Sequence, residues 1–360
     1  MKFKLAAAAS TALLCTALPS MGFVKVETKS TLNKDGSAKF SAVMEIDVSG
    51  PLTLIGQAGA ANPIGDGKDI LVGMMKGLNG YVDVWSDAKA ELTKSKTTRI
   101  SVSGFTKNWR AMADVKKVIA SLPEGNAIPL GEFPEIKLMD MKDDSAGNTV
   151  ITMAGLDDLG QVIDAGRKFA IKEGKQPKPE DVKLDKADIE KGLQQGRDLW
   201  ANFKGFAAPL VKTISITSEI EVSGTITESA VFKKTGENRA TFTFNGDHIL
   251  ALIDQVLNDE ELAGKIIDLA NAVQQNFDNE KSTAAIKSFI EPYLKAIYGG
   301  SANPKIVFKP GADAFDYAAE TEKAKATQSD ELKAILEQVG KSGKVKLPGS
   351  ATPPGKKKAA

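Results

Sequence analysis

The stretch from Val24 to Val48, VKVETKSTLNKDGSAKFSAVMEIDV, decides how the fold begins. Apolar side chains stand at even-numbered positions on both sides of its centre: Val24, Val26, Leu32, Phe40, Ala42, Met44, Ile46 and Val48. Because successive side chains point to opposite faces of a strand, each half of the stretch has one apolar face. Between the halves, Asp35-Gly36 supplies residues that tolerate the positive φ of a tight turn. The stretch therefore predicts a β-hairpin.

Further strands are predicted on both sides of a helical middle region. A second hairpin is predicted from residues 136–141 and 149–153, which flank a polar turn. Other segments with strand character are 81–85, 91–105, 214–222, 226–232, 240–244 and 306–308. Apolar residues at three- and four-residue spacing predict helices within 70–78, 112–122, 159–163, 189–200, 248–298 and 332–339.

This order of elements predicts an α+β fold with a mostly antiparallel sheet built from two β-rich parts. Helices are expected on one face of the sheet, and a helical insertion between the two parts. The expected divisions are a signal peptide over 1–22, an α+β part over 23–155, a helical insertion over 156–205, strands then helices over 206–340, and a disordered Lys/Pro-rich tail over 341–360. The parts 23–155 and 206–340 are expected to share one sheet.

Composition excludes several chemistries. The chain has 47 Lys+Arg against 46 Asp+Glu, so no net positive field favours nucleic acid. With one histidine and one cysteine, the chain cannot build a zinc site from several His and Cys ligands. A Ser-His-Asp arrangement would have to use His248, which follows a strand and precedes a helix, and there a helix-capping role is favoured.

The first residues have the layout of a secretory signal peptide. Lys2 and Lys4 precede the uncharged apolar run Leu5–Leu18, which is too short for a membrane span. Small residues before the cut favour cleavage between Gly22 and Phe23, with cleavage after Ala17 as the second choice. The protein is then expected to be exported, periplasmic or extracellular, and soluble after cleavage, with no later transmembrane helix.

The single cysteine leaves one alternative open. A lipoprotein signal places a small residue directly before the modified cysteine, whereas Leu14 precedes Cys15. Cys15 is therefore interpreted as an apolar residue of the signal peptide, and lipid anchoring at Cys15 is the minor alternative. A mature chain without cysteine cannot depend on disulfides.

Several motifs resemble functional sites and are better explained structurally. The turn after Thr31 has part of a calcium-loop pattern, but Ala42 stands where the bidentate Glu is needed. The segment 65–69 resembles a phosphate loop without its first glycine and its Ser/Thr. Paired acids are interpreted as solvated helix faces, although acids could converge in the fold. Five methionines could line an adaptable pocket, but a core role is favoured: Met74, Met75, Met139, Met141 and Met153.

Four short stretches resemble a bacterial exported family. They are TLNKDGSAKF at 31–40, RISVSGFT at 99–106, EVSGTITE at 221–228 and ATFTF at 240–244. In this arrangement of a strand–Asp-Gly–strand opening, a helix, further strands and a closing strand pair, the chain resembles the LppM-type envelope domain.

The resemblance covers about 24–155 and 210–245, and the segments 156–205 and 248–298 have no counterpart in it. It implies an extracytoplasmic domain without an assigned enzyme activity, in a family whose members are often lipid-anchored. It supplies no catalytic, cofactor-binding or metal-binding residues.

The sequence thus predicts an exported, non-catalytic binding or structural protein of the bacterial cell envelope, with a hydrophobic-ligand groove between sheet and helices. No catalytic residue, cofactor or metal ligand is assigned. The expected partner is a lipid or envelope component. An anionic surface could attract the tail lysines, but a solubilising tail without a partner is favoured: Lys341, Lys344, Lys346, Lys356, Lys357 and Lys358. The alternative is an extracytoplasmic, hydrolase-like enzyme whose Asp and Glu groups converge only in the fold.

Overall fold

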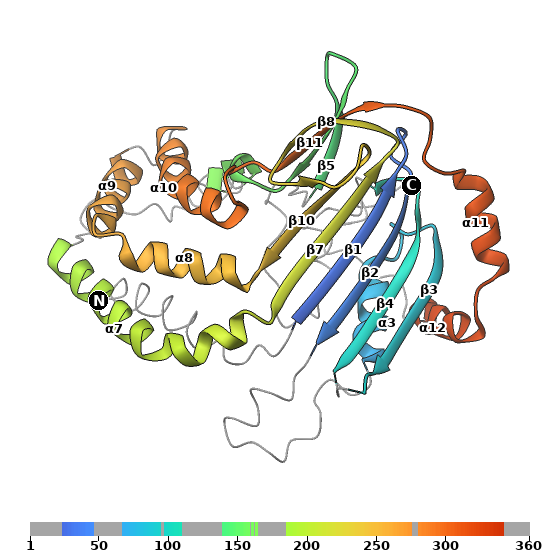
Figure 1. Cartoon of the computed structure of the whole chain (residues 1–360), viewed down its shortest axis with the longest axis horizontal. Helices are drawn as coiled ribbons and strands as arrows, with labels where there is room; N and C mark the ends of the chain where they lie inside the picture. The colour runs from blue at the N-terminus through green and yellow to red at the C-terminus, as the bar shows by residue number, and fades with distance from the viewer. Residues whose placement is uncertain are drawn as a thin grey trace, which may run out of the picture.

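A computed structural model describes residues 24–46, 67–94, 97–109, 139–158, 160–161, 163–164, 185–275 and 280–341. The α+β class is confirmed: a mixed sheet of seven strands and an antiparallel sheet of four strands are accompanied by helices (Figure 1). The expected signal peptide with Gly22 and Phe23, the expected helix over 112–122 and the tail beyond Lys341 lie outside the described residues.

The first sheet has the strand order β3-β4-β2-β1-β7-β10-β9. Its strands are β1 (Val24–Leu32), β2 (Ala38–Ile46), β3 (Val84–Leu92), β4 (Thr98–Thr106), β7 (Ile214–Val222), β9 (Lys233–Lys234) and β10 (Arg239–Asn245). The predicted hairpin is β1 and β2, which pair antiparallel around the Asp35-Gly36 turn. β1 also pairs in parallel with β7, so strands from the two β-rich parts meet at the centre of one sheet.

The second sheet has the order β5-β6-β11-β8. It contains the second predicted hairpin, β5 (Met139–Asp143) and β6 (Thr149–Met153), with β8 (Gly224–Ala230) and β11 (Lys305–Pro310). The chain passes from the first sheet to the second at Gly224, whose φ is 158° and where an added Cβ would lie 2.0 Å from the Lys309 carbonyl oxygen. This bend gives two sheets where the sequence predicts one.

Helices surround the sheets. They are α3 (Lys68–Gly77), α7 (Lys186–Val211), α8 (Gly246–Asn258), α9 (Leu262–Gln275), α10 (Glu280–Tyr298), α11 (Tyr317–Ala326) and α12 (Asp330–Lys341). Asp185, Asn245 and Asp316 accept hydrogen bonds from the first turns of α7, α8 and α11, as N-cap residues do. α7 packs on α8 around Trp200 and leads directly into β7. No helix in the described ranges is long and apolar enough to cross a membrane.

The two faces of the first sheet differ because side chains alternate. We call the face formed by the even-numbered residues of β1, β2, β4, β7 and β10 the inner face, and the opposite face the outer face. On the inner face, α3 and α12 cover one region around Phe40, Ile100 and Leu332, which we call the helix-covered core. The second sheet covers another region around Leu32 and Phe308, which we call the sheet-covered core.

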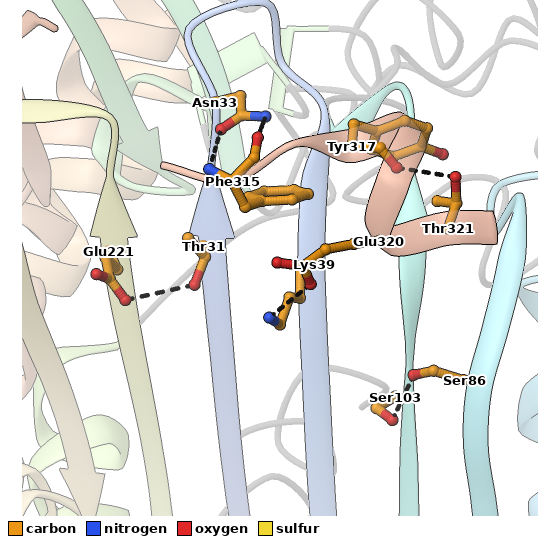
Figure 2. Close-up of polar contacts among 10 residues, drawn as sticks. All are labelled: Thr31, Asn33, Lys39, Ser86, Ser103, Glu221, Phe315, Tyr317, Glu320 and Thr321. Carbon is orange, nitrogen blue, oxygen red and sulfur yellow. Dashed lines mark hydrogen bonds and ion pairs between the residues drawn. The ribbon is translucent and has the colours of Figure 1, made fainter. Parts of the chain in front are cut away.

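The last described segment, residues 311–341, wraps around the edge strand β3, and we call it the C-terminal strap. Its helix α11 lies on the outer face, where Glu320 pairs with Lys39 at 2.8 Å, whereas α12 packs beside α3 on the inner face (Figures 1 and 2). The wrapped β3 edge is thereby protected from pairing with other chains.

Asn33 holds the beginning of the strap. Its side chain is 2% exposed and lies in the β1–β2 turn. Nδ2 donates to Phe315 O at 3.0 Å (Figure 2) and to Ser37 Oγ at 3.1 Å, and Oδ1 accepts from Ala314 N at 2.9 Å. This one amide therefore connects the hairpin turn to a segment far away in the sequence.

Candidate functional site

Rows of apolar side chains cross the inner face from strand to strand. In one row, Phe244 pairs with Ile216, Ile216 with Val26, Val26 with Met44, and Met44 with Ile100. The row runs through five neighbouring strands without a polar residue. The inner face is therefore an apolar surface that is continuous between the helix-covered and sheet-covered cores.

The centre of this face lies between the two cores. Val24, Val26 and Ile214 are half-buried, and Ile216 is 38% exposed. Within the described residues, none of these four side chains belongs to one of the hydrophobic core clusters. We call these four residues the central apolar patch. Such a patch in the middle of a sheet differs from isolated surface apolar residues, because its members are contiguous.

On β1 and β7, three hydroxyl groups interrupt the same face. Thr28 on β1 pairs directly with Ser218 on β7, and Ser30 follows two residues after Thr28. All three side chains are half-buried. They lie next to the central apolar patch and give the face a few polar groups in apolar surroundings, as binding sites for small molecules commonly have.

His248 occupies the capping position that the sequence favours. The Asn245 side chain accepts from His248 N at 3.3 Å, and His248 Nδ1 lies 3.2 Å from Asn245 N. The imidazole also stacks on Phe244 with a centroid distance of 5.8 Å and an interplanar angle of 19°. Capping explains this histidine, and its packing against Phe244 brings it to the rim of the inner face.

The methionines contribute to cores. Met75 and Met141 are fully buried, in the helix-covered and sheet-covered cores respectively. Met74, Met139 and Met153 are partly buried against the same cores. The core interpretation of these residues is therefore confirmed.

Acidic residues in the described part of the chain are held by structural partners. Asp254 accepts from Trp200 Nε1 at 2.8 Å and from Lys204 Nζ at 2.6 Å. Burial alone would raise the pKa of Asp254, but these hydrogen bonds outweigh burial and lower the pKa. A general acid needs a raised pKa, so this carboxylate has the character of an ion-paired group.

The pKa of Asp259 is lowered for the same reason as that of Asp254. Burial opposes its ionisation, but hydrogen bonds from Lys265 and from the backbone of Glu261 lower its pKa. Asp157 pairs with Lys287 at 2.9 Å, and Asp158 accepts from Gly155 N at 3.0 Å. The structure does not bring these carboxylates together in one cleft among the residues it describes.

The metal-like and phosphate-like motifs also have structural roles. Asp35 Oδ1 accepts from Ser37 N and Ser37 Oγ, which shapes the hairpin turn. Gly67 is the N-cap of α3 with a φ of 81°. Over the described ranges, no group of three or more His, Cys, Asp or Glu side chains is arranged to hold a metal ion.

Two surface clefts lie away from the inner face centre. One of about 510 Å³ is lined by α7 residues such as Glu190, by Glu260 between α8 and α9, and by Ala263 of α9. Another of about 260 Å³ lies between β3 and the C-terminal strap. Polar groups in both already have structural partners: Arg197 donates to Leu257 O, and Gln328 donates to Trp85 O at 2.8 Å. The central apolar patch with its hydroxyls is therefore the better candidate site.

Comparison with known proteins assigns no family to the chain. No family model matches the sequence, and no curated protein matches it. Among solved structures, there is a weak structural resemblance to the NMR structure of the Mycobacterium tuberculosis LppM folded domain. It has a TM-score of 0.28 and 4% identity, and covers 63% of this chain and 84% of that domain. A resemblance with this TM-score and identity assigns neither a family nor a function to the chain.

Proposed function

We propose that this chain is an exported, non-catalytic binding protein that holds an apolar molecule against the inner face of its first sheet. One observation carries the proposal: among the described residues, the central apolar patch lies between two cores and belongs to neither. Each Å² of apolar surface that a ligand covers there contributes about 25 cal/mol. A ligand that covers the patch would gain this energy without any catalytic group.

Binding is tested by titrating the full chain with N-phenylnaphthylamine, a dye that fluoresces in apolar surroundings. We expect saturable binding, and an affinity at least about tenfold lower in Ile216→Asp, because a carboxylate in the patch loses hydration when the dye covers it. The matched control is Thr217→Asp, which places the same charge on the outer face of the same strand.

The controls decide between the patch and other surfaces. Thr217→Asp should bind the dye as the unchanged chain does. Equal loss of affinity in both variants, or no saturable binding to the unchanged chain, would contradict the proposed function. Circular dichroism melting of both variants establishes that any difference is measured on folded protein.

Export is proposed from the N-terminal pattern of Lys2, Lys4 and the run Leu5–Leu18. N-terminal sequencing of protein from a bacterial envelope fraction should give Phe23 as the first residue. A lipid-modified Cys15 at the start would replace a free exported protein by an anchored one.

An envelope contact through the tail belongs to the same proposal. Six lysines and no acid lie within 341–360, and each lysine near anionic lipid contributes about 1 kcal/mol of attraction. Deletion of 341–360 should abolish low-salt association with anionic vesicles. Equal association of the full and truncated chains would exclude this contact.

A further inference from the structure

The hydroxyl groups of the inner face indicate which chemical class of ligand the face can bind. Thr28, Ser30 and Ser218 have no hydrogen-bond partner for their side chains among the described contacts. Some hydroxyls of the outer face are paired, since Thr97 Oγ1 donates to Glu45 at 2.7 Å and Ser86 and Ser103 lie 2.8 Å apart (Figure 2), whereas Ser215 and Thr217 have no such partner among the described contacts. The three inner hydroxyls are distinguished by their place, because they lie on the same face of β1 and β7 as the central apolar patch.

Their surroundings make an absent partner costly. Thr28 has Ala42 and Ser218 as its lateral neighbours, and Ser30 has Phe40 and Ile220. When an apolar molecule covers a polar group without a hydrogen bond, the lost hydration of that group is not compensated and binding is weakened. An apolar ligand without polar atoms would thus bind less well here than one that supplies a donor or acceptor.

Among the described residues of β1 and β7, the inner face also lacks the charges that an ionised headgroup would need. Along β1 and β7 the charged side chains are at odd-numbered positions, on the outer face: Lys25, Glu27, Lys29, Glu219 and Glu221. Lys25 pairs there with Glu27, and Lys29 with Glu219. An anion or cation moved onto the inner face would lose hydration without gaining a counter-charge.

We infer that the inner face selects an uncharged amphiphile, whose hydroxyl or ester group hydrogen-bonds with Thr28, Ser30 and Ser218 while its hydrocarbon chain covers the central apolar patch. This inference rests on the proposed function and names the class of its ligand. A glycerol or sugar headgroup would satisfy the same chemistry.

The test measures displacement of N-phenylnaphthylamine from the full chain by decanol and by decanoate at about pH 8, where the carboxylate is ionised. Decanol should displace the dye at a concentration at least about tenfold lower than decanoate. In Thr28→Val/Ser218→Ala the affinity for decanol relative to the affinity for the dye should fall about tenfold, the scale of one or two neutral hydrogen bonds.

A matched variant controls for changes in strand propensity. Thr217→Val/Ser215→Ala makes the same substitutions on the outer face of β7 and should leave the affinity for decanol unchanged within about twofold. Decanoylglycerol and decyl glucoside distinguish the two headgroup sources, and tighter binding of either one than of decanoate supports the inference.

The possible outcomes distinguish a failure of the inferred ligand class from a failure of the proposed binding function. If the dye binds and decanoate competes as well as decanol, or if the inner-face variant keeps its affinity for decanol, the ligand class is wrong and the apolar binding site stands. If neither the dye nor decanol binds the unchanged chain, both the site and the ligand class are refuted.

Discussion

Replacing Asn33 with alanine tests whether the C-terminal strap is fastened by a single side chain. The substitution leaves the Phe315 carbonyl and the Ala314 N–H without their partner. A buried group that loses its partner costs about 1–3 kcal/mol, and Ala314 is exposed, so water can replace its bond. We therefore expect the free energy of unfolding to fall by about 1–3 kcal/mol in total.

The loss should be concentrated in one part of the molecule. α12 keeps its buried Leu332 and Ile335, so the strap should detach first around α11. Urea unfolding followed by circular dichroism measures the global change, and limited proteolysis with mapping of the first cut measures the local one. The first cut should move into residues 311–326.

Two further variants sharpen the test. Asn33→Asp keeps an acceptor for Ala314 N but cannot donate to Phe315 O, so it should be at least as destabilising as alanine. Asn202→Ala removes an exposed amide that bonds within α7 and should change stability by less than about 0.5 kcal/mol. An Asn33→Ala protein with unchanged stability and an unchanged first cut would refute the fastening role.

Three other outcomes are expected. Gly104→Ala should cost about 1–3 kcal/mol in thermal unfolding, because the new Cβ would lie 2.6 Å from Val84 O, whereas Gly192→Ala has open space and should not destabilise. His248→Ala should lower stability by about 1 kcal/mol and leave dye binding intact; a large loss of binding would contradict a capping role. Because the folded-state pKa of Asp254 is lowered, its ionised side chain stabilises the fold above about pH 4, and this stabilisation is lost as pH falls through the folded pKa. In Asp254→Asn the free energy of unfolding should therefore depend less on pH in this acidic range. An unchanged dependence on pH would contradict this expectation.

Local patterns predicted the elements well. Alternating apolar residues and Asp35-Gly36 were sufficient for the β1–β2 hairpin, because both signals act within a few residues. The capping role of His248 was predictable from its place after a strand and before a helix. These features depend on neighbours in the sequence, so no long-range pairing was needed to see them.

The site depended on pairings that no local pattern specifies. Thr28 and Ser218 are predictable as residues on the apolar face of their strands, but only the parallel register of β1 with β7 places them side by side. The division into two sheets follows from the bend at Gly224 and from β11 pairing with β6 and β8. The sequence therefore predicts the hydroxyls on the apolar faces of their strands, but it does not predict that they lie next to each other.

The parallel pairing of β1 with β7 also determines when the first sheet can be completed during synthesis. Thr31 and Glu221, neighbours across it, are 190 residues apart. At a synthesis rate of about 5–20 residues per second, β1 emerges about 10–40 s before β7 exists. During that interval one edge of the β1–β2 hairpin has no partner strand and is open to pairing with other chains. We expect the yield of folded protein to depend on whether this unpaired β1 edge is protected until β7 has been synthesised. The yield should therefore change with the rate of synthesis and with the supply of chaperones that bind extended chains.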